Sequence, residues 1–178
     1  SSDVCSSDLR ICAFSGAGLT LPARLMAAEG DQFERLLAGL PPTSGIDFPV
    51  SPIAEHTVLE MLAGLADTVR ATFAPSAWWI ICGRQLVGLL SITALRDSGV
   101  LQIGYGIAPS FRGQGHATGA VAELLVWAKG EPRVRTVYAE TRTDNIASQR
   151  VLTRNGFVQT GQRLDDEDGE VLCWQADV

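Results

Sequence analysis

Lysine is almost absent from this sequence: it occurs once, as Lys129, and the other cationic side chains are scattered arginines. The 178 residues carry a formal net charge of −6, and the sequence pI is about 4.8. Binding to nucleic-acid phosphates calls for a basic stripe, and no run of Lys and Arg is present. The composition therefore argues against a nucleic-acid partner.

Long apolar runs and paired cysteines are missing as well. The most apolar stretch, residues 77–95, is interrupted by Arg84 and Gln85, so we interpret it as two strands and expect no membrane partner. The four cysteines form no CxxC pair, and no histidine stands at zinc-ligand spacing. We therefore expect no metal, and we expect free thiols in a reducing, cytoplasmic location.

The first nine residues differ in character from the rest of the chain. They resemble the translation of a short-read sequencing adaptor that is read in frame into the gene. We interpret residues 1–9 as an assembly artefact, with a native polar N-terminus as the alternative that resequencing of the locus would test. The length of residues 10–178 is enough for one domain with a sizeable core and short for two.

Apolar periodicity predicts an α+β fold. Helical spacing of apolar residues predicts helices over 27–40, 53–73, 114–129 and 145–155. Short runs of β-forming residues between turn signals predict strands over 19–26, 78–82, 85–95, 100–107, 134–141, 157–163 and 170–176. Together these elements predict one mixed sheet with helices on both faces.

A glycine-rich segment, residues 109–118, follows one expected strand and opens an expected helix. Gly113 and Gly115 carry no side chain, so a ligand can approach the backbone closely. The first N–H groups of a helix have no intrahelical partner, and the helix dipole adds partial positive charge there. Arg112 adds a full charge. This combination predicts a binding site for a diphosphate.

The type of diphosphate is open to several interpretations. A P-loop needs Gly-Lys-Ser/Thr, whereas His116 follows Gly115. Gly113, Gly115 and Gly119 give a GxGxxxG pattern, and Glu140 ends the next strand, as in some dinucleotide sites. The hairpins expected before the loop do not suit a Rossmann unit. An NAD(P)-dependent oxidoreductase remains a remote alternative, and a plain glycine turn is another.

Four segments in order resemble the GNAT superfamily of N-acetyltransferases. Residues 112–117 resemble its R/Q-x-x-G-x-G/A motif. Residues 102–109, 144–148 and 155–157 resemble the preceding strand, the Asn-x-x-Ser helix start and the following Gly-Phe of its ribosomal-protein-alanine acetyltransferase branch. The resemblance implies that residues 10–178 form one GNAT-type domain, with a GNAT-like central sheet, mixed and mostly antiparallel, in which two neighbouring parallel strands splay apart, with helices on both faces.

The resemblance also implies acetyl-CoA as cosubstrate, without a metal. In the family the pantetheine arm enters the splay and the diphosphate sits on the loop. Asn145 matches an Asn that hydrogen-bonds the pantetheine arm, and a simple helix N-cap is its alternative role. The residues that the resemblance assigns to the cofactor are Ile107, Ala108, Arg112, Gly113, Gln114, Gly115, His116, Ala117, Thr118 and Asn145.

The implied reaction is acetyl transfer to a primary amine, of a protein N-terminus or a small molecule, by direct attack in a ternary complex. Many relatives carry a Glu base where Gln102 stands, and others a Tyr acid where Leu152 stands. The remaining catalytic candidates are Gln102 orienting a water, Ser148 beside the sulfur and Glu140 organising the amine. The alternative for Glu140 is a pairing with an arginine such as Arg142.

Gln102 and Leu152 also support a second interpretation, a non-catalytic domain that binds acyl-CoA. Such a protein would bind CoA and show no turnover with a broad panel of amines. The family resemblance is compatible with a homodimer, and the sequence leaves the oligomeric state open.

Overall fold

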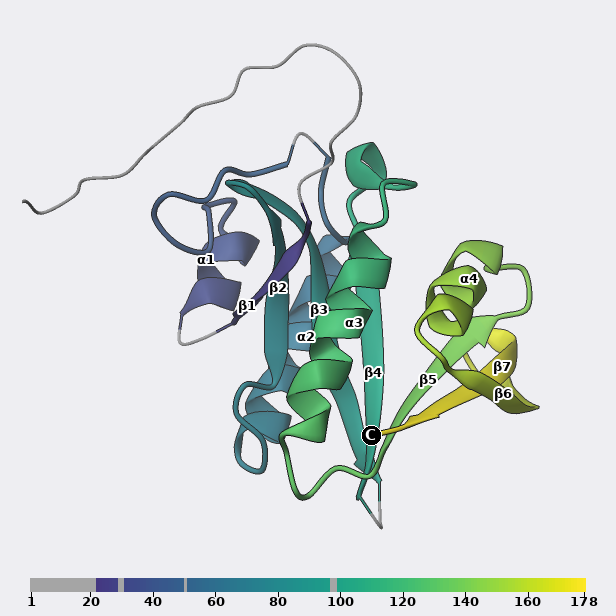
Figure 1. Cartoon of the computed structure of the whole chain (residues 1–178). Helices are drawn as coiled ribbons and strands as arrows, with labels where there is room; N and C mark the ends of the chain where they lie inside the picture. The colour runs from purple at the N-terminus through teal and green to yellow at the C-terminus, as the bar shows by residue number, and fades with distance from the viewer. Residues whose placement is uncertain (1–21, 29–30, 50, 97–98) are drawn as a thin grey trace, which may run out of the picture.

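The computed structural model describes residues 22–28, 31–49, 51–96 and 99–178. The adaptor-like residues 1–9 and residues 19–21 of the expected strand 19–26 lie outside the described residues, and residues 24–26 of that strand fall in β1 (Arg24–Ala27). The described part of the chain forms a seven-stranded sheet with the order β1-β2-β3-β4-β5-β7-β6 (Figure 1). Only β4 and β5 pair in parallel among the described strands, and the other neighbours are antiparallel.

The strands are β1 (Arg24–Ala27), β2 (Ala77–Cys82), β3 (Gln85–Arg96), β4 (Val100–Ile107), β5 (Thr136–Arg142), β6 (Val158–Asp165) and β7 (Gly169–Asp177). The α-helices are α1 (Gln32–Leu37), α2 (His56–Arg70), α3 (His116–Lys129) and α4 (Ile146–Arg154). A short 3-10 helix, η2 (Pro109–Phe111), joins β4 to the loop before α3. The α+β fold expected from the sequence is confirmed.

Two apolar cores lie on the two faces of the sheet. Strand β2 is buried on both faces, so its alternating side chains enter different cores. Trp79 belongs to the core under α1 and α2, and its indole N–H donates to Gln32 of α1 at 2.6 Å. Trp78 belongs to the core under α3, where its ring meets that of Trp127 at 5.0 Å. Helix α3 lies in front of the sheet in Figure 1 and α2 behind it.

The parallel strands β4 and β5 separate part-way along their length. Their pairing runs from Val100↔Thr136 to Ile103↔Ala139 and ends there. Beyond that point β4 stays paired with β3 as far as Ile107, and β5 stays paired with β7 as far as Arg142. A wedge therefore opens between the two strands, as the expected splay requires.

One helix boundary was predicted wrongly. A helix was expected over 27–40, but Ala27 ends β1, and α1 begins only at Gln32. Ala27 pairs with Trp78 across the β1–β2 ladder, so a non-local partner outweighs the local helical spacing. Among the residues that the structure describes, none of the helices combines the length and apolar character that a bilayer crossing needs.

Candidate cofactor and catalytic site

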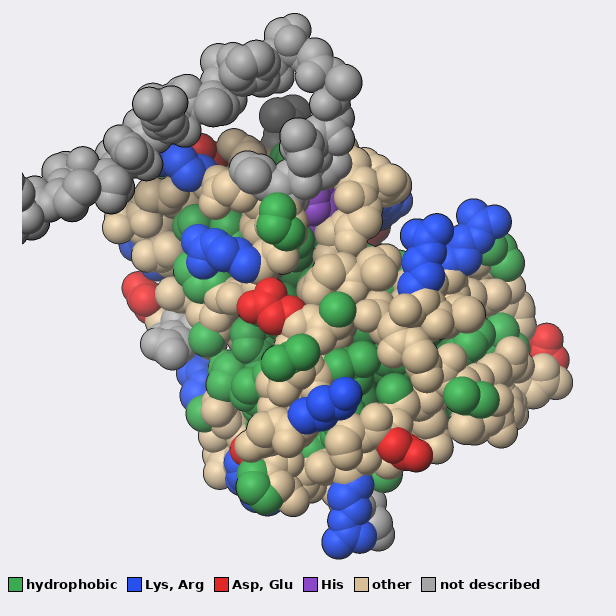
Figure 2. Space-filling view, in the orientation of Figure 1, with side chains coloured by type: hydrophobic (Ala, Val, Ile, Leu, Met, Phe, Trp, Pro, Cys, Tyr) green, Lys and Arg blue, Asp and Glu red, His purple; other side chains and the backbone are tan. Residues whose placement is uncertain are grey.

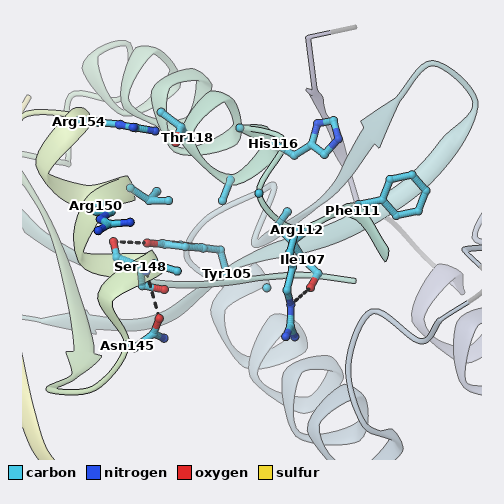
Figure 3. A pocket seen from close by; sticks show the side chains of 16 residues that line it. Tyr105, Ile107, Phe111, Arg112, His116, Thr118, Asn145, Ser148, Arg150 and Arg154 are labelled. Atoms are coloured by element: carbon cyan, nitrogen blue, oxygen red, sulfur yellow. Dashed lines mark hydrogen bonds between the residues drawn. The ribbon is translucent and has the colours of Figure 1, made fainter. Parts of the chain in front are cut away.

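A cavity of about 590 Å³ opens where β4 leaves β5 (Figure 3). Its walls come from the end of β4, the loop and first turn of α3, and the helix α4. The lining residues are Tyr105, Gly106, Ile107, Phe111, Arg112, Gly113, Gly115, His116, Ala117, Thr118, Asn145, Ala147, Ser148, Arg150, Val151 and Arg154.

Most of the residues expected to bind the cofactor share this cavity. Those that line it are Ile107, Arg112, Gly113, Gly115, His116, Ala117, Thr118 and Asn145. Ala108 does not line it: it is fully buried in the core under α2, and its N–H donates to the carbonyl of Val87 at 2.9 Å. Gln114 is also outside the lining, and its amide donates to the carbonyl of Ser110 at 3.3 Å.

The glycine loop leaves room above the start of α3. Gly113 and Gly115 have φ values of 76° and 84°, in the left-handed region that favours glycine. A Cβ built on either residue would meet nothing within 4 Å. Arg112 lines the same cavity, and its Nε donates to the carbonyl of Ile107 at 3.1 Å (Figure 3). The loop thus offers the open, positively polarised cradle that a diphosphate needs.

His116 does not supply charge to this cradle. It is the first residue of α3, it is 3% exposed, and its ring meets the ring of Phe111 edge-on at 6.2 Å. Its Nε2 has no hydrogen-bond partner among the described residues. Burial lowers the pKa of His116, so the imidazole is neutral at neutral pH.

Asn145 is a helix N-cap whose side chain also lines the cavity. Its side-chain Oδ1 accepts from the backbone N–H of Ser148 at 3.1 Å, which makes it the N-cap of α4. The same side chain lines the cavity, and its Nδ2 has no partner among the described residues. The amide nitrogen is therefore available to a ligand.

Tyr105 is a polar lining residue to which the family resemblance assigned no role. It alternates to the face opposite Gly104 and Gly106, and its O–H donates to the backbone carbonyl of Ser148 at 3.3 Å. Burial raises the pKa of Tyr105 to about 12, so the phenol keeps its proton at physiological pH. Ser148 is half-buried and lines the same cavity, so two hydroxyl groups stand close to the start of α4.

Gln102 and Glu140 lie on the other face of the sheet and do not line the cavity. Gln102 Oε1 accepts from Arg96 Nε at 3.0 Å and from Nη2 at 2.7 Å. Glu140 accepts two hydrogen bonds from Arg163, both at 2.7 Å, and one from the O–H of Tyr138. Gln102, Glu140, Arg96, Arg163 and Tyr138 form what we call the polar cluster.

Glu140 is engaged on all sides within this polar cluster. Hydrogen bonds from Arg163 are the main reason that its pKa lies below the usual range, and the side chain is 14% exposed. A pairing with an arginine was the alternative expected for Glu140. The partner is Arg163 of β6, whose side chain reaches Glu140 from the far side of β7, the strand that pairs with both β5 and β6. Arg142 pairs instead with Asp144 at 3.0 Å.

Leu152 has a hydrocarbon side chain with no proton to offer, and it is fully buried in the core under α3 and α4. Arg150 and Arg154 line the cavity without having been singled out from the sequence. Their position on α4 after the Asn-x-x-Ser start was the available signal, but a helical arginine is usually a solvated surface residue.

Residues 48–158 match the family model of the acetyltransferase (GNAT) domain, and the chain belongs to this family. Among curated proteins, the uncharacterized N-acetyltransferase YjdG of Bacillus subtilis (strain 168) is 31% identical over 78 residues. That match spans 44% of this chain and 44% of the length of the relative.

Solved structures share the fold. RimL, a ribosomal L7/L12 alpha-N-protein acetyltransferase solved in complex with coenzyme A, superposes with a TM-score of 0.68 at 21% identity, over 90% of this chain and 96% of its own. The acetyltransferase that modifies the N-terminal serine of L7/L12 from Salmonella typhimurium gives a TM-score of 0.67, at the same identity and coverage. At these identities the likeness establishes the fold.

Proposed function

We propose that this protein transfers an acetyl group from acetyl-CoA to a primary amine. The observation that carries the proposal is the cavity at the splay, where the glycine loop and the Asn145 helix start form two walls of one space. Membership of the GNAT family supports it, as does the fold shared with N-acetyltransferases of protein N-termini.

The residues present suit coenzyme A. Its diphosphate requires N–H donors and positive charge, which the first turn of α3 and Arg112 provide. Its pantetheine arm carries amides that can pair with a strand, and the edge of β4 beyond Ile103 has no strand partner on the β5 side. Asn145 Nδ2 offers one more donor along this edge. The open space over Gly113 and Gly115 admits phosphate oxygens to the backbone.

Acetyl-CoA, when bound, would supply a thioester whose carbonyl carbon can accept the amine. The chain itself would then hold protons for the thiolate that leaves. Tyr105 keeps its proton because of its raised pKa, and the Ser148 hydroxyl lines the same cavity. We propose that these two groups replace the tyrosine acid that some relatives carry at the position of Leu152.

The residues that would position the acceptor amine, Gln102 and Glu140, lie on the face of the sheet opposite the cavity. Glu140 is a poor proton acceptor because Arg163 and Tyr138 already hold its carboxylate. We propose that Glu140 is a positioning residue that fixes Arg96, and that Gln102 orients the amine or its water. The amine would then lose its proton to solvent rather than to a side chain of this cluster.

The charges near the wedge favour an acceptor with a single amine. Glu140 and Asp165 both pair with Arg163, at 2.7 Å each, and Arg96 lies 3.6 Å from Glu140. Because these carboxylates are neutralised, a polyamine or an aminoglycoside would find little attraction there. We therefore propose a peptide N-terminus or a comparable monoamine as the acceptor class.

A direct test incubates the full chain with acetyl-CoA and a panel of amines: peptides with free N-termini, a polyamine and an aminoglycoside. Thiol release reports turnover, and the mass of each product confirms the acetyl group. We expect turnover with at least one monoamine and stabilisation of the protein by CoA. If CoA binds while no amine in a broad panel turns over, the non-catalytic interpretation holds. If CoA fails to bind and NADH does, the acetyltransferase proposal is wrong.

A further inference from the structure

Two arginines line the cavity on the side away from the glycine loop. Arg150 and Arg154 stand one turn apart on α4, so both project from the same stripe of the helix. Figure 3 shows them on the α4 side of the cavity, with Arg112 on the loop side. Positive charge therefore faces the space from two separate walls.

This charge has no counterpart among the residues that the structure describes. The described part of the lining contains three arginines and neither Asp nor Glu. Most other arginines of the described chain have a carboxylate partner, such as Arg142 with Asp144 and Arg163 with Glu140. No ion pair or hydrogen bond joins the side chains of Arg150 and Arg154 to another described residue. Blue side chains gather over α4 in Figure 2 as well.

The two walls are held at a set separation. Asn155, the C-cap of α4, donates through Nδ2 to the carbonyl of Thr118 in the first turn of α3 at 3.2 Å and to the carbonyl of Val151 at 2.9 Å. Thr118 and Val151 both line the cavity. Because this bridge ties the arginine helix to the phosphate loop, a ligand with phosphates at two places meets a preformed arrangement.

In the proposed function the loop N–H groups and Arg112 hold the diphosphate, which leaves the α4 pair free to meet a second anionic group of the same ligand. Coenzyme A carries one: the 3′-phosphate of its ribose, a monoester with a second pKa of about 6 and therefore nearly two charges at neutral pH. We propose that Arg150 and Arg154 bind this 3′-phosphate and so select coenzyme A over 3′-dephospho-coenzyme A. The inference rests on the proposed cofactor.

Isothermal titration of the full chain with the two ligands tests it. At physiological salt we expect coenzyme A to bind about 10- to 100-fold more tightly than its 3′-dephospho form, in line with a charge-assisted, forked contact. In the double variant Arg150→Gln/Arg154→Gln this ratio should fall to about 3 or less, with the affinity for the dephospho form unchanged. Arg84→Gln, a 72% exposed arginine outside the cavity, is the matched control and should keep the wild-type ratio.

Equal affinity of the wild type for both ligands would overturn the inference while leaving the proposed cofactor intact. So would an equal loss for both ligands in the double variant, because the arginines would then hold the diphosphate. Absence of binding to either ligand would reject the proposed cofactor, and the 3′-phosphate site with it. Far-UV circular dichroism establishes that the variants are folded.

Discussion

Replacing Gly115 by alanine is expected to separate cofactor binding from folding. Gly115 precedes α3 with φ 84°, and an added Cβ meets no protein atom within 4 Å. The variant therefore suffers only the left-handed strain of an L-residue, about 1–2 kcal/mol. The added methyl group would stand where a phosphate must approach the N–H groups of the first turn.

The effect on binding should be larger than the effect on folding. Loss of one or two hydrogen bonds to a charged phosphate costs about 3 kcal/mol, or roughly 100-fold in Kd. With CoA at about 100 times the wild-type Kd, binding stabilises the wild type by about 2.7 kcal/mol and the variant by about 0.4 kcal/mol. For a chain of this size these energies correspond to Tm increases of about 5–11 °C and about 1–2 °C.

Gly45→Ala is the matched control, because Gly45 has the same φ of 84°, an equally open Cβ position and no place in the cavity lining. Both variants should melt lower than the wild type by a similar amount without ligand. Only Gly115→Ala should lose most of the Tm increase with CoA in a thermal-shift assay. A full CoA shift in Gly115→Ala would refute the phosphate-loop reasoning.

Three further substitutions test the rest of the site. The pKa of Glu140 is depressed in the folded protein, so the stabilisation from its carboxylate is present above about pH 4.5 and is lost as pH falls through the folded pKa. Glu140→Gln should lower the free energy of unfolding by about 1–3 kcal/mol at pH 7. The free energy of unfolding of this variant should also decline less in acid than that of the wild type, as measured by urea unfolding at a series of pH values. Asn145→Asp keeps an acceptor for the N-cap and should retain the wild-type Tm, but it lacks the amide donor and should weaken CoA binding about 10-fold in a titration; unchanged affinity would reduce Asn145 to a cap. Tyr105→Phe should lower kcat for thiol release about 100-fold and leave KM for acetyl-CoA nearly unchanged, and an unaltered kcat would exclude Tyr105 as the proton donor.

The elements that the sequence predicted well are those with local signals. The glycine loop, the Asn145 helix start and the alternation in β4 are each encoded within a few residues, and the structure has all three. The start of the helix expected over 27–40 was wrong because Ala27 belongs to β1, which pairs with β2 about fifty residues further along the chain, whereas α1 lies within the expected range. Ala108 and Gln114 were assigned to the cofactor from a motif window, which does not reveal that one of them turns into the core.

The partner of Glu140 shows the same limit in the candidate site. Arg142 was the expected arginine because it is close in sequence, but Arg163 reaches the carboxylate through the register of two strand pairs. No local pattern carries that register. Arg150 and Arg154 were missed for a related reason: whether a helical arginine meets solvent or a cavity depends on the packing of α4 near α3, which Asn155 bridges.

The two departures from the family pattern fall on opposite faces of the splay, and the structure suggests a different compensation on each. On the cavity face, Leu152 fills the core, while Tyr105 reaches from β4 to the carbonyl of Ser148 and brings a hydroxyl to the start of α4. On the other face, Gln102 stands opposite Tyr138 in the last part of the parallel ladder, and Glu140 is the first residue of β5 beyond that ladder. A carboxylate at Gln102 would have met Arg96 directly and formed another ion pair. The amide of Gln102 instead accepts from Arg96, which also lies near Glu140. Its N–H₂ group remains as a donor to a water or to a carbonyl of the acceptor substrate. These contacts favour a site that positions a neutral amine and protonates the departing thiolate over one that relies on a strong base.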